Sequence, residues 1–535
     1  METPTPPPRW PEKLLNRCCP EAIREFLLGD LYELYELRID RLGKARANLW
    51  LVLDTFSALR PFGFQNHYKN SNHLTMLVHH LKIAFRHFNR HRAYTLINAL
   101  GLAVSLACCL LIGVYLKHEL SYDRHHQNAE RIYRLTREFL NADGSTSIHI
   151  ASLAPPFVPY MREDFPEMEA ITRFSSFDNT FYIEGKHYVQ YNIAAADDSF
   201  FKVFPLAFVS GDPTTALSQP KSMVLTEEAA MKYYRTTEVV GKTFPFSSEN
   251  TYIVTGVIKE MPENSHFRLE MIVDFSWVEA RYNSNETMMR AWHANDLSTY
   301  FLLKKDASVA AIEQRFPKFF IDHMGPDVNR WTALHTQKLT DIHLHSNLDD
   351  EKGQNGSIAH IYTFSIAGLL ILVISIINYV NLTTAMSIKR AKEVGVRKVL
   401  GAGRPLLINQ FMIESVVLVS IALLAAFVLA FLALPYLRGL TGSSYAFGWI
   451  EVLQALGAVS AVGTVIGLLA GGYPAFFISN FQPLSALKSS LSTGSKGSRF
   501  RRVLVIVQFA ISSILILSTA LVFQQLEYIK GKNLG

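Results

Sequence analysis

Residues 361–388, IYTFSIAGLLILVISIINYVNLTTAMSI, decide the class of fold because they contain no Asp, Glu, Lys or Arg. About 20 apolar residues in a helix cross the roughly 30 Å of hydrocarbon in a bilayer, and a buried helix of a soluble protein normally carries a polar stripe. This stretch therefore predicts a transmembrane helix. Four further transmembrane helices are predicted at residues 93–116, 411–437, 452–478 and 503–526, and the charge-free part of the second of these is 416–437.

The composition agrees with a membrane protein and argues against a nucleic-acid-binding one. The chain has 535 residues, of which 49% are hydrophobic and 18% charged, so it is too apolar to be disordered. Its net charge of +6 is unevenly distributed. Residues 117–352 contain about 24 basic and 33 acidic side chains, a net charge of about −9. The positive charge therefore lies beside the apolar blocks, and we expect no nucleic-acid partner.

Short loops rich in Lys and Arg stay on the cytoplasmic side of a membrane. Three segments are basic in this way: the one before the first block, the one between the second and third, and residues 479–502 between the fourth and fifth. We therefore expect a multi-pass membrane protein with a cytoplasmic N-terminus. The acidic segment 117–358 is then extracytoplasmic.

Residues 117–358 show the patterns of an α+β domain. Residues 129–139 alternate like a half-exposed strand, and residues 251–275 predict two strands around a turn. Residues 221–234 predict a short strand and then a helix that begins at the N-cap Thr226. The predicted fold is an α-helical integral membrane protein of about five transmembrane helices, with an α+β extracytoplasmic domain and a small helical N-terminal domain.

Candidate catalytic and metal-binding residues are few. Gly241-Lys242-Thr243 has the ending of a phosphate-binding loop, but the glycine required five residues earlier is Thr236. His343 and His345 would lie on one side of a strand and could chelate, although no third ligand is placed by sequence. The sequence has no other nucleophile or metal motif. We therefore predict a chain that is not an enzyme and binds no metal or cofactor.

Residues 389–410 carry the most informative cytoplasmic pattern. Glu393 lies four residues from both Lys389 and Arg397, which places a charged ladder on one side of a helix. Gly401 and Gly403 would end that helix. We expect an amphipathic helix along the inner membrane surface. It could anchor to anionic lipid, or a soluble partner could bind its charged face.

The run AKEVGVRKVLGAGRPLLINQFMIES closely resembles the loop between membrane helices in the permease subunits of MacB/FtsX-type ATP-binding-cassette transporters. The runs DDSFFKVFPLAFVSGDPTTAL, KSMVLTEEAAMKYY, VVGKTF and YIVTGVIKEMPENSHF resemble the MacB-type periplasmic core domain. GGYPAFFISNFQPLSALK resembles the cytoplasmic exit of the permease unit. The resemblance covers roughly residues 72–535, and it implies a place in the bacterial inner membrane.

This resemblance implies a partner that the residues alone do not indicate. In the family, the loop helix docks on a nucleotide-binding ATPase, so ATP and Mg would be bound by a partner subunit and not by this chain. Carried over by position, the coupling surface comprises Glu393, Gly395, Arg397, Lys398, Gly401 and Gly403. We expect a membrane carboxylate such as Glu414 either to snorkel or to be paired in a signalling role. Three further intramembrane polar residues could bond between helices: Asn378, Asn381 and Gln508.

The chain departs from the family pattern at both ends. The family usually doubles the permease unit, whereas this sequence stops at Gly535, just after the fifth block. We expect a truncated chain, or a dimeric arrangement or companion chain that supplies a second half. Residues 1–60 resemble a helical permease prefix domain, and residues 61–92 form a linker and basic juxtamembrane segment.

The predicted function is the permease subunit of an exporter or mechanotransmission complex, which couples ATP hydrolysis by a partner to movement of the periplasmic domain. The alternative is a membrane-anchored sensor whose outer domain binds a ligand and whose cytoplasmic parts recruit a signalling protein.

Overall fold

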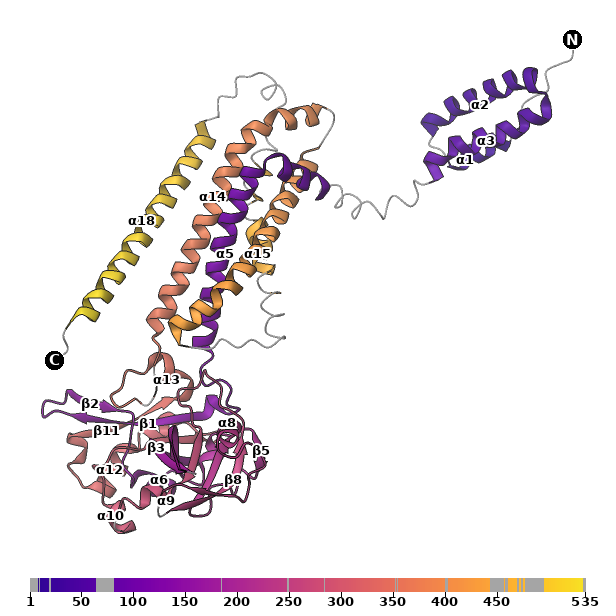
Figure 1. The fold of residues 1–535 in the computed structure, drawn as a ribbon. Helices are drawn as coiled ribbons and strands as arrows, with labels where there is room; N and C mark the ends of the chain where they lie inside the picture. The colour runs from indigo at the N-terminus through magenta and orange to yellow at the C-terminus, as the bar shows by residue number, and fades with distance from the viewer. Residues whose placement is uncertain are drawn as a thin grey trace. The chain divides into compact units, whose positions relative to one another are not determined.

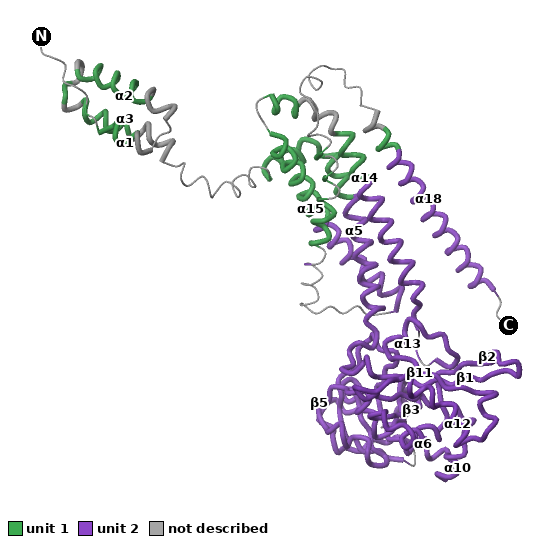
Figure 2. The backbone as a smooth tube through the Cα atoms, turned by 180° about the vertical axis from the view of Figure 1, so that it is seen from behind, with its two compact units in different colours: residues 1–100, 378–422, 459–502 green, residues 101–377, 423–458, 503–535 purple. Residues whose placement is uncertain are grey.

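The computed structural model describes the chain except at residues 1–7, 9, 19–20, 64–80, 184, 248–249, 283, 352, 354, 400–402, 443–456, 458–459, 469–470, 473–474, 477–494 and 533–535. The described residues divide into two compact units. One comprises residues 1–100, 378–422 and 459–502, and the other comprises residues 101–377, 423–458 and 503–535 (Figure 2).

Three helices form the N-terminal part: α1 (Trp10–Cys18), α2 (Glu21–Leu42) and α3 (Lys44–Gly63). Their facing sides bury a small apolar core that contains Leu15, Leu31 and Leu51. Tyr35 belongs to this core and donates a hydrogen bond from its hydroxyl to Asn48 at 2.8 Å. Residues 81–90 form a further helix that precedes the first long apolar helix.

Four helices are long and apolar enough to cross a membrane in the part of the chain that is described: α5 (Arg92–Leu120), α14 (Ile358–Val399), α15 (Arg404–Thr441) and α18 (Ser495–Gly531). About half of the predicted helix at 452–478 lies outside the described residues, and residues 460–468 are helical. The predicted helix at 361–388 and the residues of the loop helix as far as Val399 form one helix, α14. Figure 1 shows α14 bending near its C-terminal end.

Helices α5 and α14 pack side by side through small and aromatic residues. The Cys109 thiol donates to the carbonyl of Gly368 at 3.4 Å, and the rings of Tyr115 and Phe364 meet edge to face at 5.2 Å. Small residues at such positions let helices approach closely in a membrane, where packing rather than the hydrophobic effect drives association. Cys108 and Cys109 are both free thiols.

The segment between α5 and α14 contains one sheet of eleven strands within the described residues (Figure 1). The strands are β1 (Ile132–Leu140), β2 (Thr146–Ile150), β3 (Met168–Ile183), β4 (Lys186–Ala196), β5 (Phe208–Gly211), β6 (Ser222–Thr226), β7 (Thr243–Pro245), β8 (Thr251–Ile258), β9 (Met271–Asp274), β10 (Ser298–Leu303) and β11 (Thr332–Lys338). The main order is β11-β1-β10-β3-β4-β9-β6-β8-β5, with β2 paired to β1 and β7 to β8. All pairs are antiparallel except β4 with β9 and β6 with β8.

Short helices and 3-10 turns complete this α+β domain: η1 (Ala129–Arg131), α6 (Phe157–Asp164), α7 (Phe200–Val203), α8 (Glu227–Tyr234), α9 (Ser276–Glu279), α10 (Asn285–Met289), α11 (Val309–Glu313), α12 (Phe316–Met324), η2 (Val328–Arg330) and α13 (Leu339–His345). The predicted N-cap is confirmed, because the Thr226 hydroxyl accepts from the backbone N–H of Ala229 at 3.2 Å. Three apolar clusters, rich in Phe, fill the domain.

The prediction of a strand for His343 and His345 is wrong. Both residues lie on α13, which buries Leu339, Ile342 and His343, whereas His345 is exposed. The spacing of the buried residues follows a helix and separates the two imidazoles. His343 stacks on Tyr122 and bonds to Glu119, so the pair does not form a chelate. The described residues contain no group of three or more His, Cys, Asp or Glu that could hold a metal.

Both connections between the long helices and the domain are tied by ionic hydrogen bonds. Where α5 ends, the Glu119 carboxylate contacts His343 Nε2 at 2.8 Å. Where the chain leaves towards α14, Glu351 receives two hydrogen bonds from the buried Arg134 of β1, at 2.7 and 2.8 Å. Burial opposes ionisation of Glu351, but the hydrogen bond and charge of Arg134 outweigh it and lower its pKa. Arg134 therefore fastens the outgoing segment to the sheet.

Asp123, in the segment after α5, begins a buried series of three hydrogen-bonded polar side chains. Asp123 Oδ1 lies 2.9 Å from His266 Nδ1, and His266 Nε2 lies 2.8 Å from the Tyr300 hydroxyl. Burial would raise the pKa of Asp123, but the charge and hydrogen bonds of His266 prevail and lower it. The neighbouring His126 is also buried, and desolvation lowers its pKa to about 3. Its ring is therefore neutral at pH 7.

Candidate coupling site

A continuous chain of polar contacts joins the end of α14 to the beginning of α15. Glu393 and Arg397 form an ion pair across one helical turn at 2.7 Å. Arg397 also donates to Gln410 Oε1 at 2.6 Å, and Gln410 Nε2 donates to Glu414 Oε1 at 3.0 Å. We call these four residues the polar chain. The polar chain runs from the surface to the interior of the helices, because Glu393 is exposed and Glu414 is only 7% exposed.

An apolar seat holds the end of α14 beside this chain. Val394 is buried against Leu407 and Phe411 of α15 and against Ala475. Each buried apolar side chain of this size stabilises a contact by roughly 1.5–3 kcal/mol relative to an exposed one. The seat therefore fixes the side of α14 that faces α15, and the residues on either side of Val394 project elsewhere.

The outward side of the same turns combines charge with exposed apolar side chains. Val396 is 48% exposed, Val399 is 65% exposed and Leu406 is also exposed. Glu393 and Gly403 are exposed near them. Glu393, Val396 and Val399 follow one another at intervals of three residues on α14, which places them toward one side of the helix, and Leu406 lies near the start of α15. Exposed apolar side chains beside a charge are candidates for a docking site. We call Glu393, Val396, Val399 and Leu406 the docking face.

Most of the residues predicted for a coupling surface lie at this place, with differing exposure. Arg397 and Lys398 are half-buried, and Gly395 is buried and contributes no outward surface. Gly401 lies outside the described residues. The exposed valines and Leu406 were not singled out in the sequence, because apolar residues beside a membrane helix look like part of that helix.

Glu414 is buried among the helices, and its carboxylate accepts a hydrogen bond from Gln410. The other polar residues predicted within the membrane lie elsewhere. Asn378 and Asn381 are half-buried on α14, and Gln508 is half-buried on α18. The side-chain oxygen of Asn381 is buried without a hydrogen-bond partner. Gln410, which links Arg397 to Glu414, carries no signal in the sequence that would have identified it.

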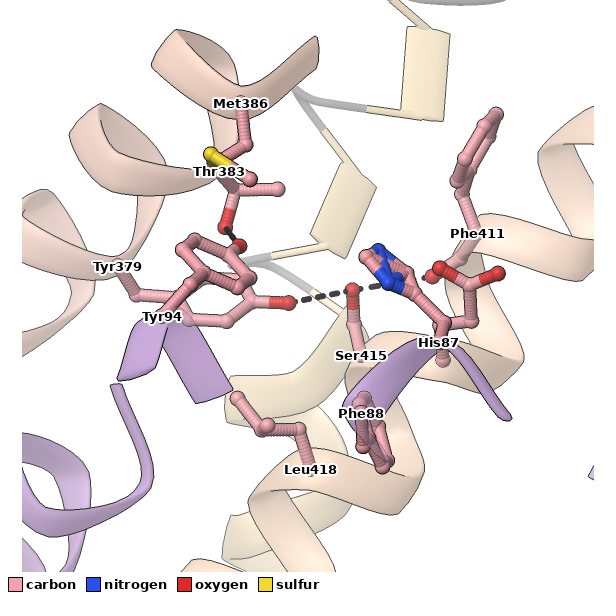
Figure 3. Close-up of a pocket in the computed structure, with 10 residues that line it drawn as sticks. His87, Phe88, Tyr94, Tyr379, Thr383, Met386, Phe411, Ser415 and Leu418 are labelled. Carbon is pink, nitrogen blue, oxygen red and sulfur yellow. Dashed lines mark hydrogen bonds between the residues drawn. The ribbon is translucent and has the colours of Figure 1, made fainter. Parts of the chain in front are cut away.

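A small cavity of about 30 Å³ is lined in part by Glu414. Three helical segments supply its walls: residues 87–94, residues 379–386 of α14 and residues 411–418 of α15 (Figure 3). Two hydroxyl pairs bridge these segments. Tyr94 and Thr383 are 2.7 Å apart, and Tyr379 donates to Ser415 at 2.8 Å (Figure 3).

Two glycines four residues apart, Gly467 and Gly471, lie close to α15. A Cβ atom on Gly471 would lie 2.6 Å from Cβ of Ser415, and one on Gly467 would lie 3.3 Å from Cα of Val416. Only glycine permits this approach, and Gly-x-x-x-Gly spacing is a known means of close helix packing in membranes. Gly471 therefore lies directly behind Ser415, which lines the cavity.

Comparison with known proteins assigns two domains to the chain. Residues 95–319 match the MacB-like periplasmic core domain, and residues 365–483 match the FtsX-like permease C-terminal domain. The uncharacterized ABC transporter permease YvrN of Bacillus subtilis (strain 168) is 22% identical over 77% of this chain and 100% of its own length.

Further matches carry the name MacB. The macrolide export ATP-binding/permease protein MacB of Bdellovibrio bacteriovorus is 32% identical over 22% of this chain and 17% of its own length. A crystal structure of the periplasmic region of MacB from Actinobacillus actinomycetemcomitans is 15% identical, and the alignment covers 39% of this chain and 90% of that one with a TM-score of 0.28.

Proposed function

Because this chain is a multi-pass MacB/FtsX-like permease, we propose that it is the membrane subunit of an ATP-binding-cassette exporter or mechanotransmission complex. A separate cytoplasmic ATPase would bind ATP and Mg²⁺ and would dock on the docking face. Its movement would be passed through α14 to the α+β domain, which would lie outside the inner membrane. The comparisons do not favour the alternative of a ligand sensor.

The continuity of α14 is the observation that supports this proposal most directly. One helix of 42 residues begins at Ile358, shortly after the Arg134–Glu351 clamp, and ends at Val399 in the docking face. A hydrogen-bonded helix resists bending and stretching far more than a loop does, because each residue fixed in it adds a backbone hydrogen bond. A push on its last turns would therefore be transmitted along the helix.

The polar chain and the apolar seat support the same proposal at the docking end. Val394 anchors the last turns of α14 to α15, while Arg397 and Gln410 join the charged surface to Glu414. A partner that binds Glu393 would act on Arg397 directly, since the two side chains are paired. Two helices would then respond together to one docking event.

Co-purification with the ATPase from native membrane tests the docking face. We expect Glu393→Lys and Val399→Asp to lose the ATPase, because the first reverses the charge of the contact and the second places a charge on its apolar part. Val240→Asp is the matched control, since Val240 is 48% exposed on the α+β domain. Full retention of the ATPase by both docking-face variants would reject the proposed surface.

Accessibility of single cysteines tests the orientation. A cysteine at position 399 and one at position 240, in a chain with Cys18, Cys19, Cys108 and Cys109 replaced by serine, should react with membrane-impermeant maleimide from opposite sides of the membrane. Labelling of both positions from one side would contradict transmission across the bilayer.

A further inference from the structure

The outward side of α3, in the N-terminal part of three helices, is apolar. The inward side packs on α1 and α2 through the buried residues Ala47 and Leu51. Four apolar side chains that we call the outer face are largely exposed on α3: Leu49 at 65%, Trp50 at 44%, Val52 at 39% and Leu53 at 52%. At about 100° per residue they fill an arc of about 160° that is centred opposite Leu51. A helix that is apolar on all sides is normally covered on all sides, so the outer face needs a partner.

We propose that the outer face lies on the membrane surface and inserts among the headgroups of anionic phospholipids. This contact goes beyond the proposed permease function, because it requires neither an ATPase nor a movement of the α+β domain. It gives the three-helix part an attachment to the bilayer in addition to the spanning helices of the same chain.

The charge beside the outer face matches a negatively charged surface. Residues 41–53 contain Arg41, Lys44 and Arg46 and no acidic residue. Lys44 is exposed at the start of α3, five residues before Leu49. Basic side chains close to an anionic leaflet are attracted to it, and the attraction fades within a Debye length. An apolar face alone would suit any apolar partner, whereas the adjoining positive charge favours an anionic one.

The side chains of the outer face are of the kind that membrane interfaces favour. Trp is enriched at this level because its ring is apolar while its N–H is polar, and leucines on the same helix side reach the boundary of the acyl chains. The centroid of the Trp50 ring lies 5.0 Å from the guanidinium of Arg38, which is paired with Asp54. This contact holds the ring at the border between α2 and α3, beside a positive charge.

The chain itself keeps the outer face near a bilayer. Residues 64–80 separate α3 from the helix at 81–90, which precedes the spanning helix α5. A segment of this length reaches at most about 60 Å even when it is fully extended. A contact between tethered parts forms at a high effective concentration, so a modest apolar patch is enough to hold it. A soluble protein partner has no such advantage.

Quenching by spin-labelled lipid tests the proposal in the full-length protein. The native cysteines are replaced by serine, and Leu53→Cys provides one site for an NBD fluorophore. The protein is reconstituted in nanodiscs of phosphatidylcholine and phosphatidylglycerol in equal parts, with doxyl groups on some of the acyl chains. We expect quenching at least threefold stronger than for a label introduced by Glu36→Cys. Glu36 is exposed on α2, about 160° around that helix from Arg38.

Two substitutions in the chain labelled at position 53 test the two sources of attraction. Leu49→Asp places a charge on the outer face and should reduce quenching to the level found at position 36. Lys44→Glu should reduce quenching at least twofold, and so should replacement of phosphatidylglycerol by phosphatidylcholine. Lys13→Glu is the matched control and should have no effect, because Lys13 is exposed on α1, which packs on the inward side of α3. The two substitutions are independent, so the test stays decisive if one of them disturbs the fold.

Three results would overturn the proposal. The first is quenching at position 53 that is no stronger than at position 36 in anionic nanodiscs. The second is quenching that neither Leu49→Asp nor Lys44→Glu reduces. The third is protection of the label from aqueous iodide without quenching by lipid, which would show that a protein surface, of this chain or of a second copy, covers the outer face. The assay contains no ATPase, so its failure would leave the docking-face proposal unaffected.

Discussion

Acidification should lower the free energy of unfolding through His126, which lies between the end of α5 and the α+β domain. This side chain is 3% exposed, and both ring nitrogens are buried without hydrogen-bond partners. Burial is the main cause that lowers its pKa from 6.5 to about 3; the charge of His125 adds to the effect and that of Asp123 opposes it. The folded protein therefore keeps His126 neutral in a range of pH where the unfolded chain protonates it.

The sign and size of the effect follow from this difference. Because the folded pKa is below the unfolded one, the stabilisation is complete above pH 6.5 and is lost as the pH falls towards 3. Each pH unit in that window costs about 1.4 kcal/mol, so His126 should lower the free energy of unfolding by about 2 kcal/mol between pH 7 and pH 5. The lowered pKa of His125 acts in the same direction. Asp123, whose pKa is also lowered, should contribute only below pH 4.

Urea unfolding of the detergent-solubilised protein at pH 7 and pH 5 measures this loss. Tryptophan fluorescence reports on the domain, because Trp292 stacks on Tyr160 inside it. We expect His126→Phe to reduce the loss of unfolding free energy between the two pH values by about 2 kcal/mol. A wild-type-like loss in this variant would refute the assignment of the pH dependence to His126.

Three further substitutions should have effects on stability that follow from the packing and hydrogen bonds. Gly471→Leu should destabilise the helices by about 1–3 kcal/mol in mixed-micelle unfolding, because its Cβ would meet Ser415; Gly472→Leu, whose Cβ would meet nothing within 4 Å, should not. Thr226→Ala should cost about 1 kcal/mol of unfolding free energy in urea through the lost N-cap, and an unchanged midpoint would contradict that role. Glu351→Ala should lower the free energy of unfolding by about 3 kcal/mol and speed hydrogen exchange of residues 346–357, because it leaves Arg134 buried without its carboxylate. Unchanged exchange would show that the Arg134–Glu351 pair does not hold that segment.

Local patterns in the sequence predicted the parts of this protein that depend on neighbours along the chain. The apolar blocks predicted the spanning helices, and the spacing of Glu393 and Arg397 predicted an ion pair that the structure contains. Thr226 predicted the start of α8 because an N-cap needs only a hydroxyl followed by a helix-forming run. Each of these features is decided within one or two helical turns.

Contacts between distant segments could not be predicted in this way. Gln410 bonds to Arg397 across the connection between two helices, and no spacing rule relates the two positions. The cavity needs side chains from three separate segments. The strand prediction for His343 failed because the alternation of DIHLH fits a strand, whereas burial of Leu339, Ile342 and His343 follows a helix.

The chain enters and leaves the α+β domain at nearly the same point. A Cβ atom on Gly356, just before α14, would lie 2.6 Å from the carboxylate of Glu119 at the end of α5. A domain whose two ends adjoin can be inserted into, or removed from, a host loop without separating the elements on either side. The spanning helices should therefore tolerate replacement of residues 121–355 by a short Gly-Ser linker, and the excised module should be portable to other helical hairpins.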